Sequence, residues 1–167
     1  MNKDQRALIL DLSLGKISKD KFLRLFSGQV EMNGSYLCDE LHRAFLSKDA
    51  DDIEHLLLLG FQFGIADNCS EVLCKLILEG WHMQHENIAM ILKELKSPNS
   101  VDYLYQAALA SFPYLDYDES YALGVKCIYA LRAIGTSDAR ERLLSLASGE
   151  NKTLAENAKR LLKTMAV

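Results

Sequence analysis

The sequence contains few residues that break helices. Of its 167 residues, two are proline and nine are glycine. Because these two residues most often interrupt helices, the segments between them are long and uninterrupted. A fold of many short strands joined by tight turns is therefore disfavoured, and a helical fold is favoured.

A long apolar run is missing from the start of the chain. The first residues, MNKDQRALILDLSLGK, carry Asp4 and Asp11 on either side of a brief apolar run. This pattern resembles neither a signal peptide nor a membrane-spanning helix. We therefore expect a cytoplasmic protein.

Closely spaced cysteine pairs are also lacking. The four cysteines stand in apolar, helical surroundings at Cys38, Cys69, Cys74 and Cys127. Cysteines of this kind usually behave as small buried hydrophobic residues in a reducing compartment. We expect this behaviour of all four, which agrees with a cytoplasmic location.

A strong excess of one charge is absent, but the charge is unevenly spread. Nineteen Lys and Arg against 23 Asp and Glu give a net charge of −4. Residues 34–71 contain eight acids and two bases, a charge of −6. Residues 112–125 contain three acids and no base, a charge of −3. Residues 126–167 contain eight bases and four acids, a charge of +4. The strongly basic face that usually marks a nucleic-acid-binding protein is missing from most of the chain.

What the sequence does contain is a repeat. Residues 92–110, LKELKSPNSVDYLYQAALA, recur in altered form at residues 131–149, LRAIGTSDARERLLSLASG, an offset of 39. In each copy a small polar cluster ends one helix and begins another, which has an acid in its first turn. A period near 40 residues with one such turn per unit is typical of stacked helical hairpins.

The spacing of apolar residues predicts ten helices in one domain of 167 residues, whose 49% apolar content can supply a core. The expected helices cover residues 4–14, 19–26, 35–47, 53–64, 71–80, 86–96, 101–112, 120–134, 139–147 and 154–165, with a loop over 28–34. The helix over 53–64 is apolar nearly all round, so we expect it to be central.

The second helices of the last three units align with one another. Ile88, Ile91, Leu92 and Leu95 correspond to Cys127, Ala130, Leu131 and Ile134 at an offset of 39, and then to Ala158, Leu161, Leu162 and Met165 at a further 31. The second offset is eight residues short. An insertion loop over residues 112–119, between the two helices of its own repeat, accounts for the difference, and such insertions often form the binding face of a repeat protein.

These residues resemble the HEAT family of helical repeats. The resemblance implies an all-α fold, namely an α-α superhelix in which about four HEAT-like helical hairpins form a solenoid over residues 34–167. Residues 1–33 would form an N-terminal helical cap, and residues 1–167 a single domain. The whole chain is also similar to small HEAT-like immunity proteins of bacterial polymorphic and contact-dependent toxin systems. Those proteins bind and block one cognate toxin domain.

The sequence offers little for catalysis. His82 and His85, with Cys69 and Cys74 nearby, are the best metal-ligand cluster, but the two cysteines lie about 140° apart around a helix and no second tight pair exists. A Gly-x-Ser-x-Gly elbow and a phosphate-binding glycine pattern are both missing. We expect His55, which lies within an apolar helix, to be a core histidine whose ring nitrogens have hydrogen-bond partners. We predict no enzyme, no cofactor and no metal.

The predicted binding surface combines aromatic rings with acids. Tyrosine provides large, stiff contact area of the kind found at interface hot spots. The candidate partner-binding residues are Tyr114, Asp116, Tyr117, Asp118, Glu119 and Tyr121 of the loop, together with Tyr103, Trp81 and the acidic corner Asp49, Asp51 and Asp52. The structural alternative is that Tyr114, Leu115 and Tyr121 pin the loop to the core, that Trp81 belongs to the core, and that the corner is a solvated helix start.

The leading hypothesis is a non-catalytic protein-binding module. In its sharpest form, which the resemblance implies, it is an immunity protein that occludes the active face of a basic cognate toxin, such as a nuclease. One alternative is a nucleic-acid-binding, HEAT-like protein of the DNA-repair type, which would use Arg132, Arg140, Arg142, Lys152, Lys159, Arg160 and Lys163. Another is a scaffold or maturation factor for a different enzyme.

Overall fold

The computed structural model describes residues 1–26 and 34–165. Over these residues the chain forms ten α-helices and three short 3-10 helices, and no strand. The prediction of an all-α fold is therefore confirmed. The loop expected over residues 28–34 lies outside the described residues except for Gly34, at which a helix begins.

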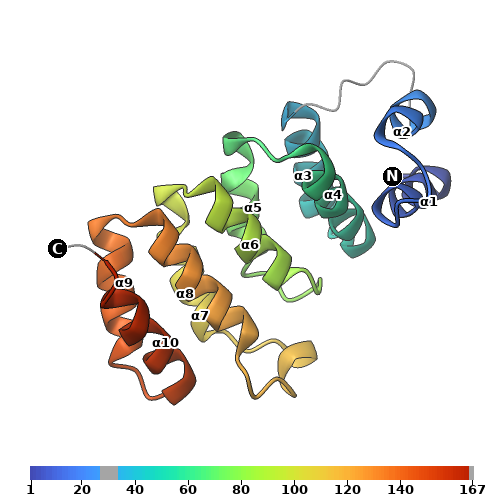
Figure 1. The fold of residues 1–167 in the computed structure, drawn as a ribbon. Helices are drawn as coiled ribbons and strands as arrows, with labels where there is room; N and C mark the ends of the chain where they lie inside the picture. The colour runs from blue at the N-terminus through green and yellow to red at the C-terminus, as the bar shows by residue number, and fades with distance from the viewer. Residues whose placement is uncertain (27–33, 166–167) are drawn as a thin grey trace. The chain divides into compact units, whose positions relative to one another are not determined.

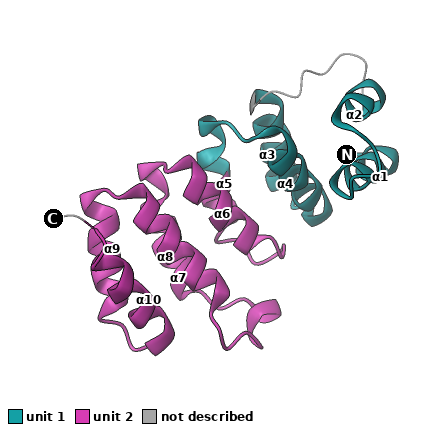
Figure 2. Cartoon of the chain, in the orientation of Figure 1, with its two compact units in different colours: residues 1–72 teal, residues 73–167 magenta. Residues whose placement is uncertain are grey.

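The chain packs as two compact units, residues 1–72 and residues 73–167 (Figure 2). The boundary between them falls inside helix α5 (Ser70–Leu76). The division expected from the sequence, an N-terminal cap over 1–33 and repeats over 34–167, does not coincide with this boundary. The single domain of 1–167 stays a prediction.

Helix α4 (Ala50–Phe63) is the centre of the first unit, in agreement with its apolar sequence. It packs against α1 (Lys3–Ser13) and α3 (Gly34–Ser47), and α1 also contacts α2 (Lys19–Phe26). The α4 side chains Ile53, Leu56, Leu57 and Leu59 are all buried. A short 3-10 helix, η1 (Asp67–Cys69), follows α4 and leads into α5.

The cysteines correct one expectation. Cys38 of α3 and Cys69 of η1 form a disulfide, although 31 residues separate them in the sequence. The pair connects two segments that pack together in the first unit, a tertiary contact that sequence spacing does not reveal. Cys74 and Cys127 are buried, as expected, and burial raises the pKa of the Cys127 thiol.

The second unit has two layers of helices. In one layer, α8 (Ala122–Ile134) packs against α6 (His85–Leu95) on one side and α10 (Lys152–Leu162) on the other. In the other layer, α7 (Val101–Leu109) contacts α9 (Ser137–Ala147). Across the layers, α7 pairs with α8 and α9 pairs with α10, so that each pair forms a helical hairpin (Figure 1).

Some of the aligned positions of the repeat have equivalent environments. Ile88, Cys127 and Ala158, one from each unit of the alignment, have 0% of their surface exposed. Leu92 and Leu131 are buried to the same extent, whereas Leu162, their counterpart in the last helix, is half-buried. The sequence alignment therefore identified positions that face the core of the second unit.

The two copies of the polar turn differ. In the second copy Thr136 caps α9, and its Oγ1 accepts a hydrogen bond from the amide of Ala139 at 3.2 Å. In the first copy Ser97 makes no such cap, and a 3-10 helix, η2 (Pro98–Ser100), precedes α7. Proline has no amide hydrogen and a fixed φ, so it suits the first position of this tight turn.

Helix α5 is shorter than expected, ending at Leu76 rather than near Gly80. The carbonyl oxygen of Leu76 accepts a hydrogen bond from Nε2 of His82 at 2.9 Å. An imidazole thus satisfies one of the carbonyl groups that the end of a helix leaves unpaired. The sequence pattern alone did not show that a side chain six residues downstream would take this role.

Candidate partner-binding site

Three turns of the second unit lie along one edge, which we call the hairpin edge. They are residues 77–84 between α5 and α6, residues 110–121 between α7 and α8, and residues 148–151 between α9 and α10 (Figure 1). The second and third turns share this edge because they join the paired helices α7 and α8, and α9 and α10. The insertion predicted over 112–119 lies within the second of these turns and contains the 3-10 helix η3 (Pro113–Leu115).

A row of aromatic rings links the first turn to the second. The ring centroids of Trp81 and His82 are 5.0 Å apart, those of His82 and His85 are 4.5 Å apart, and those of His85 and Phe112 are 3.7 Å apart. His82, His85 and Phe112 are buried. The insertion is therefore attached to the preceding turn by contacts between rings rather than extending freely from α7.

His85 also holds Tyr114 by a hydrogen bond. Nε2 of His85 lies 2.9 Å from the carbonyl oxygen of Glu79, so this nitrogen carries the proton and donates. Nδ1 is then an acceptor, and the Tyr114 hydroxyl donates to it at 2.8 Å. Burial, with the neighbouring His82, lowers the pKa of His85 to about 4, which keeps the ring neutral, and burial raises the pKa of Tyr114 to about 12. Tyr114 thus anchors the loop, as the structural alternative expected.

Asp118 organises the end of the insertion. Its carboxylate accepts hydrogen bonds from the amide of Ala122 at 2.7 Å and from the amide of Ser120 at 2.9 Å. The hydroxyl of Ser120 donates to the same carboxylate, and these hydrogen bonds lower the pKa of Asp118. Tyr121, which precedes α8, has a positive φ of 54°, a conformation that an aromatic residue rarely adopts. The Asp118 hydrogen bonds stabilise this turn.

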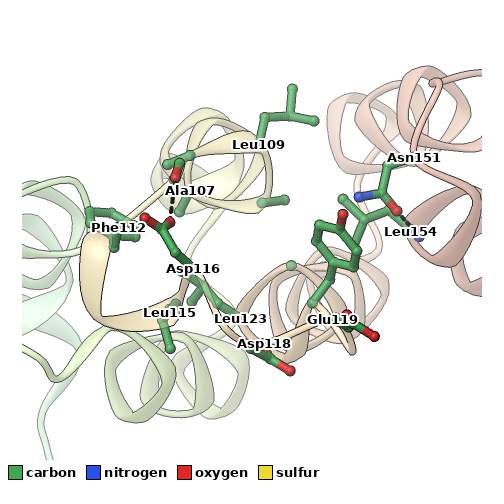
Figure 3. A pocket seen from close by; sticks show the side chains of 15 residues that line it. Ala107, Leu109, Phe112, Leu115, Asp116, Asp118, Glu119, Leu123, Asn151 and Leu154 are labelled. Atoms are coloured by element: carbon green, nitrogen blue, oxygen red, sulfur yellow. Dashed lines mark hydrogen bonds between the residues drawn. The ribbon is translucent and has the colours of Figure 1, made fainter.

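A pocket of about 430 Å³ opens beside the insertion (Figure 3). Its walls come from the end of α7, the insertion, the start of α8 and the α9–α10 turn. Leu109 and Leu154 line it on the helical side, and Asp116, Asp118 and Glu119 line it on the loop side. The pocket therefore combines apolar walls with carboxylates from three positions.

Four of the six candidate residues of the loop meet at this pocket: Asp116, Asp118, Glu119 and Tyr121. Asp116 accepts a hydrogen bond from the hydroxyl of Ser111 at 2.9 Å through one of its two carboxylate oxygens. Tyr121 is 48% exposed. Tyr117, which stands between the pocket residues Asp116 and Asp118 in the sequence, is 82% exposed. The residues available to a partner here are thus Tyr117, Glu119 and Tyr121, together with one oxygen of Asp116.

Two other candidate aromatic residues are placed differently. Trp81 is half-buried on the hairpin edge, and its indole nitrogen donates to a carboxylate oxygen of Glu79 at 2.8 Å. Tyr103 lies in the first turn of α7, at the opposite end of that helix from the insertion, and does not line the pocket. The structure thus brings Trp81 to the hairpin edge and leaves Tyr103 away from it.

The acidic corner belongs to the first unit and has internal partners, which are Arg6 and, for Asp52, the N-terminal ammonium of Met1. The guanidinium of Arg6 lies 2.9 Å from Asp49, 3.0 Å from Asp51 and 2.7 Å from Asp52. Burial opposes the charge of Arg6, but the hydrogen bond to Asp52 and the three carboxylates outweigh it and raise the pKa of Arg6. Asp52 is buried, and Asp49 caps α4 by accepting from the amide of Asp52 at 2.9 Å. A role in partner binding stays a prediction for these acids.

Several of the bases proposed for nucleic-acid binding have partners within the second unit. Arg142 pairs with Asp102 at 2.8 Å and lies over the ring of Tyr105. Arg160 donates to the Tyr129 hydroxyl at 2.8 Å, and Arg132 donates to the carbonyl oxygen of Thr164 at 3.0 Å. Arg140 has a buried Nη1 with no hydrogen-bond partner in the described chain. Lys152, Lys159 and Lys163 are exposed.

Sequence reasoning missed some of the residues that build the site. The sequence indicates His85 only as a possible metal ligand, yet it holds the loop in place. Asn151 and Leu154, which line the pocket from the next hairpin, gave no signal beyond the polar residue that precedes a helix. The spacing of residues within one hairpin does not predict which residues of the next hairpin contact it.

The candidate metal ligands and His55 lie within the described residues. Over residues 1–26 and 34–165, no group of three or more His, Cys, Asp and Glu side chains is arranged to hold a metal ion. His55 is satisfied on one side only: its Nδ1 lies 2.6 Å from the carbonyl oxygen of Asp51, while its buried Nε2 has no partner within the described residues. None of the described helices combines the length and apolar character needed to cross a membrane.

Comparison with known proteins gives no assignment: no protein-family model matches the chain, and neither the curated proteins nor the solved structures yield a significant match.

Proposed function

We propose that the chain is a non-catalytic protein-binding module whose binding site is the hairpin edge of the second unit. The observation that supports this most directly is the insertion over residues 112–119. It is anchored through Tyr114 and Asp118, while Tyr117 and Tyr121 remain exposed beside an acidic pocket. Because the loop is already ordered and presents tyrosines, little of its conformational entropy is lost when a partner binds.

The more specific proposal is an immunity protein that neutralises a bacterial toxin. The resemblance to small HEAT-like immunity proteins suggests this class, and the carboxylates at the pocket favour a basic partner. A toxin that cleaves nucleic acid must carry basic groups to hold phosphates, so an acidic surface with aromatic rings can cover its active face. Neutralisation then results from occlusion.

Co-purification with the product of the neighbouring gene tests the proposal. We expect a stable complex, and we expect cells that express the neighbouring gene to survive only when this chain is also present. Tyr117→Ala should weaken the complex by about tenfold or more, because exposed tyrosines at interfaces often contribute over 1 kcal/mol. Phe61→Ala, at an exposed aromatic position of α4 in the first unit, is the control and should leave the affinity unchanged. Absence of both complex and rescue would contradict the proposal.

The alternative is a nucleic-acid-binding function that uses the basic C-terminal third of the chain. Lys152, Lys159 and Lys163 are exposed on or beside α10, but Arg142 and Arg160 already have internal partners. A gel shift at low salt decides between the two: affinity for DNA or RNA that weakens steeply with salt favours the alternative. A scaffold or maturation factor would instead co-purify with an enzyme that it does not inhibit.

A further inference from the structure

The pocket beside the insertion has the size and shape to receive part of another molecule. Its volume, about 430 Å³, lies within the range of roughly 300–1,000 Å³ found for ligand pockets. Two hairpins form it: Leu109 and the insertion belong to one, and Asn151 and Leu154 to the next. Figure 3 shows Leu109 and Leu154 on the helical side, with Asp116 and Glu119 on the insertion.

The packing of two helices keeps the pocket wall in place. Asn151 caps α10 by accepting a hydrogen bond from the amide of Leu154 at 3.1 Å. Leu154 lies directly over Gly124 of α8, where an added Cβ would be 2.6 Å from a methyl carbon of Leu154. A larger residue at position 124 would therefore displace Leu154, a wall of the pocket.

The charge of the pocket is negative and is not balanced by its own lining. No Lys or Arg lines the pocket, and residues 112–125 contain none. The next base in the sequence, Lys126, forms an ion pair with Glu86. In the described chain the carboxylate of Glu119 makes no hydrogen bond or ion pair, and only one oxygen of Asp116 accepts. A cationic group that enters the pocket meets carboxylates with free acceptor positions.

The chemistry of the walls narrows the choice of cation. Apolar side chains such as Leu109 and Leu154 suit an alkyl stem, and the half-exposed ring of Tyr121 offers a face for stacking. A guanidinium stacks on aromatic rings, is more weakly hydrated than an ammonium and forms two parallel hydrogen bonds to a carboxylate. An arginine side chain meets all of these features, whereas lysine meets only the charge and the alkyl stem.

We propose that this pocket is the receptor for one arginine side chain projecting from a basic protein partner. The proposal rests on the proposed function for the existence of a partner, and it adds which residue type enters and where. Glu119 forms the ion pair with the guanidinium, Tyr121 stacks on it, and Leu109 and Leu154 contact its alkyl stem.

A peptide titration tests the pocket without knowledge of the partner. The probe is acetyl-Gly-Arg-Gly-amide, added to the full-length isotope-labelled chain at low salt and followed by amide chemical shifts. Two matched probes replace arginine by lysine or by citrulline, which has nearly the same shape as arginine but no charge. We expect shifts that cluster at residues 109–124 and 151–154, and binding of the arginine peptide about threefold to fivefold tighter than that of the citrulline peptide.

The matched variants are Glu119→Gln and Glu94→Gln. Glu94 is an exposed acid on α6, and its substitution removes the same charge away from the pocket. Glu119→Gln should reduce the affinity for the arginine peptide by about threefold to fivefold, and Glu94→Gln should leave it unchanged. Equal binding of the arginine and citrulline peptides, equal effects of the two variants, or shifts spread over other acidic turns would each overturn the proposal.

The same variants separate this proposal from the proposed function. A protein partner that binds wild-type chain and Glu119→Gln with equal affinity would disprove the arginine receptor and leave the protein-binding function standing. Peptide binding that depends on Glu119, without any complex formed by the neighbouring gene product, would support the receptor and count against the immunity function. A partner affinity that falls about tenfold in Glu119→Gln supports both.

Discussion

The hydroxyl of Tyr114 donates a 2.8 Å hydrogen bond to Nδ1 of His85, and this contact joins the insertion between α7 and α8 to the start of α6. The two residues are 29 positions apart in the sequence. Because the other nitrogen of His85 is bound to the carbonyl oxygen of Glu79, the ring has a single tautomer that fits both partners. The loop that carries the candidate binding residues is held by one neutral histidine.

Removing this hydrogen bond should destabilise the protein. We expect Tyr114→Phe to lower the free energy of unfolding by about 1 to 2 kcal/mol, because the variant leaves the buried Nδ1 of His85 without a donor. Urea denaturation measures the loss. Tyr117→Phe is the control, since Tyr117 is 82% exposed and its substitution should change the unfolding free energy very little. Equal effects of the two substitutions would show that the hydrogen bond contributes nothing.

The lowered pKa of His85 predicts a loss of stability in mild acid. The pKa of His85 is about 4 in the folded chain, against about 6.5 in an unfolded one. Between these values the unfolded chain binds a proton that the folded chain does not. The free energy of unfolding should therefore fall as the pH drops from about 6.5 to about 4, by roughly 3 kcal/mol, and this contribution should level off below pH 4.

The buried His82, whose pKa is also lowered by burial, adds a loss of the same sign. Urea denaturation of the wild-type chain and of His85→Gln between pH 7 and pH 4 isolates the contribution of His85, which should be missing from the variant. His42→Gln, on the exposed surface of α3, is the control and should keep the wild-type pH dependence. A pH dependence that is the same in all three proteins would rule out this assignment.

The acidic corner predicts a second stability effect, in the first unit. Arg6→Met should lower the free energy of unfolding by about 1 to 2 kcal/mol, because it removes the guanidinium shared by three carboxylates and leaves the buried Asp52 with the N-terminal ammonium of Met1 as its ion-pair partner. Arg24→Met, at an exposed position of α2, is the matched control. In an Asp52→Asn background the effect of Arg6→Met should shrink, and an unchanged effect would mean that the pair is not coupled.

The disulfide can be tested directly. Mass spectrometry of the non-reduced protein after proteolysis should find a peptide that joins Cys38 to Cys69. Reduction should lower the free energy of unfolding by about 3 to 4 kcal/mol, the value expected from chain entropy for a loop of some 30 residues. Cys38→Ser should show no further loss when a reductant is added. If the reduced and non-reduced chains unfold at the same urea concentration, the disulfide does not contribute.

Local patterns in the sequence predicted most of the helices. The apolar period of residues 53–64 identified α4 as central, and the buried Ile53 and Leu57 agree. The polar cluster before Ala139 was recognised as a cap, and Thr136 does cap α9. These features depend on residues three or four apart, so one sequence contains the information. Helix ends were less accurate where a side chain from elsewhere intervened, as His82 does at the end of α5.

The features that the sequence did not reveal are contacts between distant residues. The ion pairs of Arg6 join residues 43 to 46 positions apart, and the disulfide joins residues 31 positions apart. The acidic corner seemed free in the sequence because its partner lies on another helix. For the candidate site, the insertion and its acids were found from the broken repeat period. The pocket was not, since Asn151 and Leu154 come from the next hairpin.

The position of Trp81 gives the hairpin edge its own optical probe. The chain contains one tryptophan, and its ring lies edge-on to His82 at 5.0 Å, in the same row of rings that holds the insertion. Its intrinsic fluorescence therefore reports from a single place, with no background from another indole. A change in this emission on mixing with a protein that contains no tryptophan would report binding near this edge of the molecule, and titrating that signal would yield an affinity without any attached label.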